Sequence, residues 1–322
     1  MLRVLGDEPE NRAQLLEPSP ITMPFPYRRR MEVIRCSSPK VFLEDTAAYR
    51  ELEPIRTNIQ GSVATSVVSG AQRHDDHWWW VARDSGGEVV GAAIRTAPFG
   101  LQIGPMPVAA AAALAREVST HDDDVPWVVG SEQIVAAFLD AYRSSRTPGS
   151  SRKVRRGRCD VIYEAGEMAQ PNVEGLSRTA TMEDFDIAYQ WNLDFMEFID
   201  GVAPSSDERD REALRARLTA GALWFWCVDH TPVSMAGHAS RVQTPGGVIT
   251  RVGPVYTPAG LRHHGYGAAI TASLTDSLQR EGSRVMLYAD ATNATSNGVY
   301  RRIGYHIVDQ VTRYEFGSDH TA

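Results

Sequence analysis

The sequence is poor in cysteine, and the three cysteines that it has lie far apart. Cys36, Cys159 and Cys227 show none of the paired spacings of a disulfide framework or of a cysteine-rich zinc site. We therefore expect idle thiols and no metal site. A chain of 322 residues needs no such crosslink, because it can bury about 75% of the surface that its unfolded form exposes.

Long hydrophobic runs are lacking too. No apolar stretch approaches the roughly 18 to 20 residues that a membrane helix requires, and the polar start, Met1 to Glu10, has no signal-peptide core. We expect a cytoplasmic protein with no membrane partner.

An excess of positive charge is also absent. The formal net charge is −7 and the isoelectric point is near 5.7, whereas nucleic-acid binding rests on clustered Lys and Arg. We therefore expect no nucleic-acid partner. The basic segment 144–158 is a local exception, and its Ser, Gly and Pro content favours a solvated linker over an anion-binding patch.

The chain does contain two similar halves. The hairpin Trp80 to Ala93 aligns with Trp226 to Ala239, and Ile103 to Met106 aligns with Val252 to Val255. Each hairpin has an aromatic strand, a tight turn and a strand of small residues. A tandem arrangement of two related units is therefore predicted.

Periodicity and turn residues predict the elements of both halves. The first half is expected to hold helix-compatible residues from Lys40 to Ser66, strands at 78–82 and 88–95, and helices Val108 to Val118 and Ser131 to Tyr142. A strand Cys159 to Glu164 follows. The second half is expected to contain a helix after Gly175 with Thr181 as its N-cap, a helix 206–220, strands 223–228, 233–242 and 248–256, a helix 268–281 and a strand 284–289.

The two halves differ after the aligned Gly-Pro strands. The first runs through Pro107 directly into its helix, whereas the second inserts a loop at 257–267. Here a strand ends, glycines let the backbone approach closely, and a helix begins with unpaired N–H groups, which favours an anion. Arg262 adds a charged fork, and His263 and His264 add hydrogen-bond donors.

Two common phosphate-binding signatures do not fit this loop. It lacks the Gly-Lys-Ser/Thr ending of a nucleotide-triphosphate loop, and Gly265-Tyr266-Gly267 lacks the third glycine of a dinucleotide fingerprint. The pattern (Arg or Gln)-x-x-Gly-x-(Gly or Ala) instead resembles the pyrophosphate-binding signature of the GNAT superfamily of N-acetyltransferases. Residues 293–305 resemble that family's Asn-x-x-(Ala/Ser)-x-x-x-Tyr-x-x-x-Gly-(Phe/Tyr) segment. The resemblance is clear from Leu223 to Phe316 and looser over the whole chain.

The resemblance implies an α/β (α+β) fold of tandem GNAT-like halves, each a mixed, mostly antiparallel sheet flanked by helices. It divides the chain into an irregular arm (1–30), a degenerate GNAT-like domain (31–143), a basic linker and connecting strand (144–174) and a catalytic domain (175–322). Since only the second half has the loop, we expect one coenzyme site per chain.

The implied activity is transfer of an acetyl or other short acyl group from acyl-CoA to a primary amine by direct attack. Acetyl-CoA would be the cosubstrate, without a metal, and a small-molecule or peptide amine the acceptor. The sequence leaves open the identity of that amine, the preferred acyl chain and any oligomer. The alternative is a non-catalytic coenzyme A sensor or scaffold, suggested by the missing loop of the first half and the lack of an evident base.

The resemblance also assigns roles to individual residues. Tyr300 matches the family's general acid. The coenzyme-binding residues would be Val255, Thr257, Arg262, His263, His264, Gly265, Tyr266, Gly267, Ala268, Asn293 and Ser296. Asn293 would touch the pantetheine arm, cap the helix of Tyr300, or do both. The family's common loop has Gly and Arg at positions 263 and 264, so the histidines are expected to weaken binding and make it pH-dependent.

No single general base follows from the sequence. Glu197, Asp194, Asp200 and His238 all lie on segments that could face the acceptor, and a water chain is a further possibility.

Overall fold

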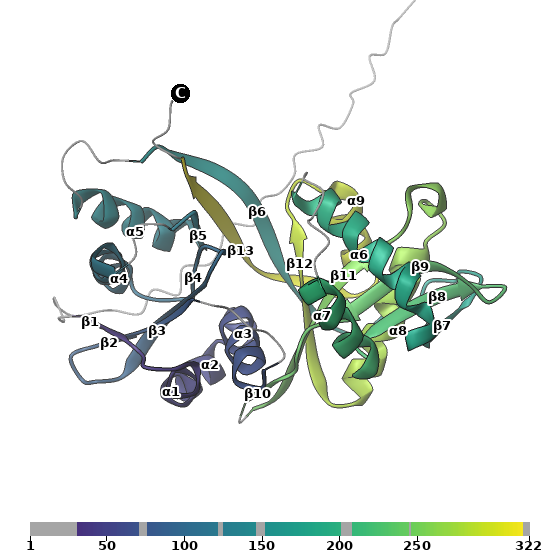
Figure 1. Ribbon diagram of the computed structural model, residues 1–322, viewed down its shortest axis with the longest axis horizontal. Helices are drawn as coiled ribbons and strands as arrows, with labels where there is room; N and C mark the ends of the chain where they lie inside the picture. Colours follow the sequence, from purple (N-terminus) through teal and green to yellow (C-terminus); the bar gives the residue numbers. More distant parts are fainter. Residues whose placement is uncertain are drawn as a thin grey trace, which may run out of the picture.

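The computed structural model describes residues 31–70, 76–121, 125–145, 152–200, 208–244 and 246–317. The expected arm 1–30 lies outside these ranges. Within them, twelve strands run side by side in the order β1-β2-β3-β4-β5-β13-β6-β12-β11-β9-β8-β7, and β10 pairs with β11. Figure 1 shows two lobes joined by the long strands β6 and β13.

The first lobe has helices on both faces of a short sheet. Its strands are β1 (Glu32–Arg35), β2 (His77–Arg83), β3 (Val89–Thr96), β4 (Leu101–Ile103) and β5 (Trp127–Gly130). Its helices are α1 (Pro39–Asp45), α2 (Ala47–Leu52), α3 (Asn58–Val68), α4 (Val108–His121) and α5 (Glu132–Ser144). The strands pair antiparallel except β4 and β5, which are parallel because α4 crosses over between them.

The second lobe repeats this order. Its strands are β7 (Leu176–Thr179), β8 (Leu223–Val228), β9 (Thr231–His238), β10 (Val242–Thr244), β11 (Gly247–Tyr256) and β12 (Ser283–Asp290). Its helices are α6 (Phe185–Asp200), α7 (Glu208–Thr219), α8 (Tyr266–Arg280) and α9 (Ala294–Arg302), with 3-10 turns η1 (Met182–Asp184) and η2 (Ala259–Leu261). Here β11 and β12 are the parallel pair and α8 is the crossover. The mixed α/β architecture with tandem halves is confirmed.

The last strand of each half lies in the other half's sheet. β6 (Val154–Ala165) follows α5 in the chain but pairs with β12, whereas β13 (Tyr305–Phe316) follows α9 but pairs with β5. β6 and β13 also pair with each other along most of their length. The segment expected to be a connecting strand therefore builds the sheet beside the second half's parallel pair, and the domain boundaries stay a prediction.

The core of the second lobe explains how α8 is held. Its buried face includes Ala269, Ile270, Leu274 and Leu278, at the spacing of one helix face. These residues pack on Val252 and on other inward side chains of the strands. The helix N-terminus is thereby fixed at the end of β11, beside the loop.

Four expected elements differ from the structure. The expected strand 233–242 is observed as β9, which ends at His238, and residues 239–241 lie outside any strand before β10. The residues after Gly175 form strand β7 before the helix, since residues 176–179 pair with β8. The residues from Lys40 to Ser66 form three helices, with breaks at Thr46 and around Pro54. β6 begins at Val154, five residues earlier than expected.

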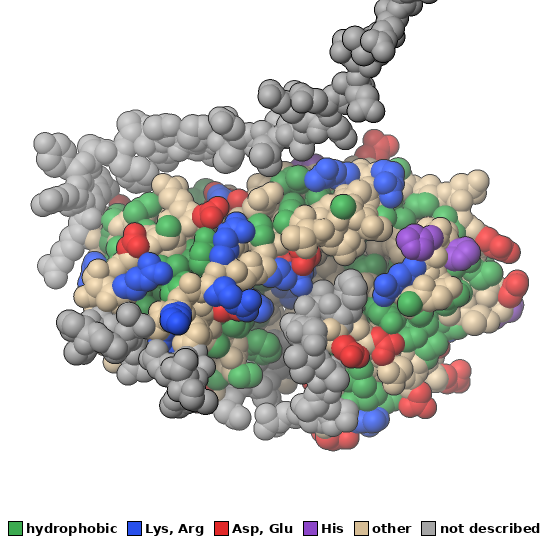
Figure 2. Space-filling model, turned by 90° about the horizontal axis from the view of Figure 1, so that it is seen from above, with side chains coloured by type: hydrophobic (Ala, Val, Ile, Leu, Met, Phe, Trp, Pro, Cys, Tyr) green, Lys and Arg blue, Asp and Glu red, His purple; other side chains and the backbone are tan. Residues whose placement is uncertain are grey.

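The early start of β6 also bears on the basic segment. Figure 2 shows Lys and Arg side chains spread over the upper face of the molecule, with acidic side chains among them. In β6, Arg155 pairs with Glu315, and Arg158 pairs with Asp160 at 2.6 Å. The Arg155–Glu315 pair links β6 to β13, whereas Arg158 and Asp160 both lie on β6. Residues 154–158 belong to a paired strand and are therefore not a flexible linker.

Candidate functional site

The parallel strands β11 and β12 separate beyond Val252. Their pairing runs from Val248 to Val252, although β11 continues to Tyr256 and β12 to Asp290. On its other edge, β11 has an irregularity in its pairing with β9 between Val252 and Val255, at Gly253 and Pro254. The two strands therefore splay apart at this end, and residues 253–256 have no partner on β12.

The loop that follows β11 is held by hydrogen bonds of its own. The Arg262 Nε–H donates to the Thr257 carbonyl oxygen at 3.0 Å, and the hydroxyls of Thr257 and Ser234 lie 2.8 Å apart. His263 has a φ of 68° and Gly265 a φ of 82°, so the backbone turns through two left-handed residues before α8. His263 and His264 are exposed, and the His264 ring stacks on Tyr266 with centroids 5.4 Å apart.

This geometry fits a pyrophosphate. Gly265 is the N-cap of α8 and supplies no side-chain cap, so the first-turn amides of Tyr266, Gly267 and Ala268 point out of the helix toward the loop. A Cβ at Gly267 would lie 3.2 Å from the Thr257 hydroxyl oxygen, so glycine keeps this approach clear. Residues 257–268 include Arg262 and contain no acidic side chain. The cradle therefore offers donors and positive charge to an anion.

Tyr300 lies on α9 with its side chain 9% exposed. Its ring lies 6.0 Å from that of Tyr163 and 6.0 Å from that of Tyr305. Within the described residues, its hydroxyl has no hydrogen-bond partner, whereas those of Tyr163 and Tyr305 bond to Asn297 and Thr275. Burial, with a smaller contribution from Tyr163, raises the pKa of Tyr300 to about 12. The phenol therefore carries its proton at neutral pH.

Asn293 caps the helix that carries Tyr300. Its side-chain oxygen accepts a hydrogen bond of 3.0 Å from the Ser296 N–H. One of the two roles expected for Asn293 is thus seen directly, and Ser296 contributes its backbone to it.

Asn297 is a positioning residue that the sequence analysis missed. Its side-chain nitrogen donates to the carbonyl oxygens of Asp290 (2.7 Å) and Asn293 (2.8 Å), and its side-chain oxygen accepts from the Tyr163 hydroxyl (2.8 Å). It therefore fastens α9 to β12 and β6. The available signal was a second asparagine four residues after Asn293, one helical turn along.

Replacing Asn293 by alanine should destabilise the protein by about 1 kcal/mol, because the α9 cap is lost. Asn293→Ser keeps a capping oxygen and should lose less. Urea unfolding of both variants measures the difference, and equal stability of the alanine variant and the wild type would refute a capping role.

The first half lacks a comparable opening. The Tyr49 hydroxyl donates to the Pro105 carbonyl oxygen at 2.6 Å, and a Cβ at Gly104 would lie 2.7 Å from that hydroxyl. A tyrosine side chain thus occupies the strand end that corresponds to the second half's loop. This contact supports the prediction of one coenzyme site per chain.

A cavity of about 470 Å³ lies between the two lobes and reaches Gly253 at the splay. Its wall comes from α3 of the first lobe and from α7, β9 and β11 of the second. The polar side chains of this wall include Ser62 and Ser66 of α3, Arg217, His238 and Arg251. Sequence reasoning missed both arginines, because their elements meet only in the folded chain.

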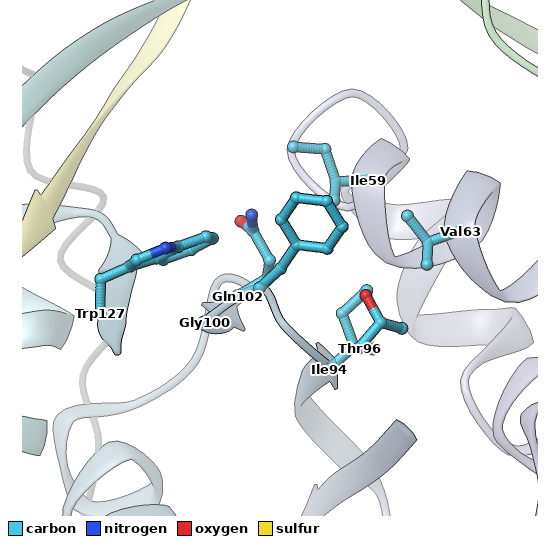
Figure 3. Close-up of a pocket in the computed structure, with 8 residues that line it drawn as sticks. Ile59, Val63, Ile94, Thr96, Gly100, Gln102 and Trp127 are labelled. Atoms are coloured by element: carbon cyan, nitrogen blue, oxygen red, sulfur yellow. The ribbon is translucent and has the colours of Figure 1, made fainter. Parts of the chain in front are cut away.

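A smaller cavity, of about 140 Å³, lies in the first lobe beside α3. Figure 3 shows Ile59, Val63 and Ile94 on one side of it and Trp127 on the other. Val63 lines both cavities, so the apolar hollow is next to the larger one.

The structure separates the four candidate bases. The Asp194 carboxylate accepts hydrogen bonds from Tyr256 (3.1 Å) and Gln190 (2.8 Å), and Glu197 is exposed. The side chain of Asp200 lies outside the described part of the structure. Of the four, His238 is the residue in the wall of the larger cavity.

His238 is held in one tautomer. Its Nδ1 lies 2.9 Å from the Ala239 carbonyl oxygen, which can only accept, so Nδ1 carries the proton and Nε2 is the basic nitrogen. Burial lowers the pKa of His238 below its ordinary value, with further lowering by Arg241 and Arg217. The ring is therefore neutral at pH 7.

Across the described ranges, no three His, Cys, Asp or Glu side chains come together in a way that suits a metal ion. No described helix has the length and apolar character to cross a membrane.

Comparison with known proteins supports the sequence resemblance. Residues 228–314 match the model of the FR47-like protein family. No curated protein matches the sequence.

Solved structures resemble the chain over most of its length. A GNAT-family acetyltransferase from Colwellia psychrerythraea is 11% identical, with a TM-score of 0.56 over 88% of this chain and 99% of its own. A GCN5-related N-acetyltransferase from Sphaerobacter thermophilus is 15% identical, with a TM-score of 0.55 over 89% and 98%. A tandem GNAT protein from the clavulanic acid biosynthesis pathway is 14% identical, with a TM-score of 0.50 over 90% and 100%. The resemblance to the GNAT superfamily, in its tandem form, is confirmed at the level of fold.

Proposed function

We propose that this chain of GNAT fold is an acyl-CoA-dependent N-acetyltransferase that acetylates a primary amine of a small molecule or peptide. One observation carries the proposal. The N-terminus of α8 follows the end of β11 that has left β12, and α9, which carries the mostly buried Tyr300 with its unpartnered hydroxyl, follows the end of β12. An anion cradle and a protonated acid at one strand opening are what transfer from an acyl-CoA requires.

In this proposal the loop holds the pyrophosphate of acetyl-CoA. The amides of residues 265–268 and the guanidinium of Arg262 would bind its oxygens, and the exposed rings of His263 and His264 would add donors. The backbone of Thr257, fixed by Arg262 and Ser234, would shape the cradle.

The backbone N–H near Val255 would stabilise negative charge as it develops on the thioester oxygen. It lies on the part of β11 that has left β12. Tyr300, which is protonated at neutral pH, would then donate its proton to the departing thiolate.

His238 would accept the proton of the attacking amine through Nε2. Its ring lines the cavity that reaches Gly253, so the base and the reacting carbonyl would share one opening. The charged groups that influence it are Arg217, Arg241 and Glu281.

Replacing His238 by glutamine should lower kcat/KM on the order of 100-fold and remove a limb of the pH profile. Because the histidine pKa is lowered, the neutral base is present above its ordinary value of 6.5 and is lost only as pH falls through the lower folded value. The variant should lack that acid-side loss. His306→Gln, at an exposed position of β13, is the matched control and should retain the wild-type profile.

The function itself is tested by acetyl-CoA-dependent thermal stabilisation, followed by release of free thiol in the presence of a panel of amines. Stabilisation together with amine-dependent thiol release is expected. A protein that neither binds acetyl-CoA nor releases thiol would contradict the proposal.

A further inference from the structure

Two arginines line the cavity between the lobes without a carboxylate partner among the described residues. Arg217 comes from α7 and Arg251 from β11, and the described cavity wall contains no Asp or Glu. Arg241, at the edge of the same wall, pairs instead with Glu281. The cavity therefore has unneutralised positive charge on its second-lobe side.

Contacts with β9 and β11 fix the position of the Arg217 side chain. Its Nη2–H donates to the Gly253 carbonyl oxygen at 3.1 Å, and its guanidinium lies where a Cβ at Gly237 would clash with it. Because Gly237 has no Cβ, the Arg217 guanidinium can lie close to β9 at the splay. One hydrogen bond uses one of five N–H donors, so the others remain for a ligand.

Holding both guanidinium groups at this cavity costs free energy, because each loses part of its hydration. Burial, with a smaller contribution from the nearby charge of Arg251, lowers the pKa of Arg217 to about 10, and burial also lowers the pKa of Arg251. Both stay charged at neutral pH. Two partly desolvated like charges at one cavity are stabilised when an anion binds between them.

The rest of the wall suits a polar ligand of modest size. Ser62 and Ser66 face the cavity from α3, and the Ser66 and Ser240 hydroxyls lie 2.9 Å apart across the two lobes. A volume of about 470 Å³ accommodates a small molecule.

We propose that the acceptor is an amine that also carries an anionic group, a carboxylate or a phosphate, which Arg217 and Arg251 bind. This rests on the proposed acetyltransferase function and names the substrate class of that site. Gly253, which Arg217 contacts, is two residues from Val255, or ~7 Å along an extended strand. A short spacer between the anion and the amine, as in an amino acid, therefore matches the distance from the arginines to the reacting carbonyl.

The test compares matched acceptors that differ only in charge. L-Alanine is measured against L-alaninamide, and O-phosphoethanolamine against ethanolamine, with saturating acetyl-CoA. In at least one pair, the wild type should use the anionic amine with a kcat/KM on the order of 10- to 100-fold higher than that of the neutral amine. The pH of each assay is chosen so that the two amines of a pair have the same unprotonated fraction. The pair with the larger preference identifies the anion as carboxylate or phosphate.

Arg251→Gln should collapse this preference to within about threefold, and Arg217→Lys should reduce it because a bidentate fork is lost. Arg284→Gln is the matched control, since Arg284 is also on the β11–β12 pair but binds Glu164 on the surface. It should retain the full preference. Retained stabilisation by acetyl-CoA verifies that each variant is folded.

The outcomes separate the two proposals. Equal or better use of the neutral amines, or a preference that survives Arg251→Gln, overturns the anionic acceptor and leaves the acetyltransferase. If no amine is acetylated, the coenzyme A complex is titrated with N-acetyl-L-alanine and N-acetyl-L-alaninamide, and with N-acetylethanolamine phosphate and N-acetylethanolamine. If an anionic compound of either pair binds and its neutral counterpart does not, the anion site is supported although the enzymatic function has failed. If neither anionic compound binds, the proposed anion site is overturned.

Discussion

Replacing Tyr300 by phenylalanine should lower kcat on the order of 100-fold or more while the affinity for acetyl-CoA changes less than about twofold. The change removes only the hydroxyl, which has no partner within the described structure, so little stability should be lost. Steady-state kinetics with one accepted amine, together with acetyl-CoA titration, measures both quantities.

Tyr305→Phe is the matched control for this prediction. Tyr305 lies in the same aromatic cluster, but its hydroxyl is bonded to Thr275 at 2.6 Å. Its loss should destabilise the fold by about 1 kcal/mol and leave kcat near the wild-type value. Unchanged turnover in Tyr300→Phe would remove Tyr300 as the acid, and equal losses in both variants would indicate a packing effect.

Replacing Gly265 by valine should reduce acetyl-CoA affinity at least about 10-fold. Gly265 has a φ of 82°, which costs a residue with a Cβ about 1 to 2 kcal/mol, and the added Cβ would lie 2.9 Å from the Val173 side chain. A β-branched residue adds to both penalties. The loop should therefore move and misplace the first-turn amides of α8, which calorimetric titration with acetyl-CoA would detect.

Gly260→Ala is the control within the same loop, because a Cβ there meets nothing within 4 Å. Its affinity for acetyl-CoA should stay within about twofold of the wild type. Normal binding by Gly265→Val would show that the coenzyme is not held by this helix terminus.

The part of the fold nearest the site was predictable because it is encoded locally. The expected strand 248–256 is observed as Gly247–Tyr256, and the expected helix 268–281 as Tyr266–Arg280. Glycines, a terminating strand and a helical apolar face all lie within one short stretch. The alignment of the two hairpins likewise predicted the tandem sheet, since each hairpin carries its own turn residues.

What the sequence could not predict depends on contacts between distant segments. The exchange of β6 and β13 between the halves leaves no mark in local pattern, because either sheet would bury the same alternating side chains. The strand β7 is only four residues long and half-exposed, so its pattern is weak. Arg217 is one of several charged residues on a polar helix, and only the packing of α7 beside β9 and α3 shows that it faces a cavity.

The choice among candidate bases was open for the same reason. Asp194 and His238 are 44 positions apart, and nothing in the sequence around them favours one as the base. In the structure, Asp194 accepts a hydrogen bond from the Tyr256 hydroxyl, whereas His238 lines the cavity at the splay. Tertiary structure, not residue type, distinguishes them.

We propose that an acyl group passes from coenzyme A to an amine at the splay beside α8. The most direct measurement incubates the purified chain with acetyl-CoA and a panel of acidic and neutral amines, and quantifies free coenzyme A and N-acetylated amine by mass spectrometry. We expect equal amounts of the two products with at least one amine, and a loss of both in Tyr300→Phe. Binding of acetyl-CoA without any acetylated amine would contradict it and indicate a coenzyme A sensor.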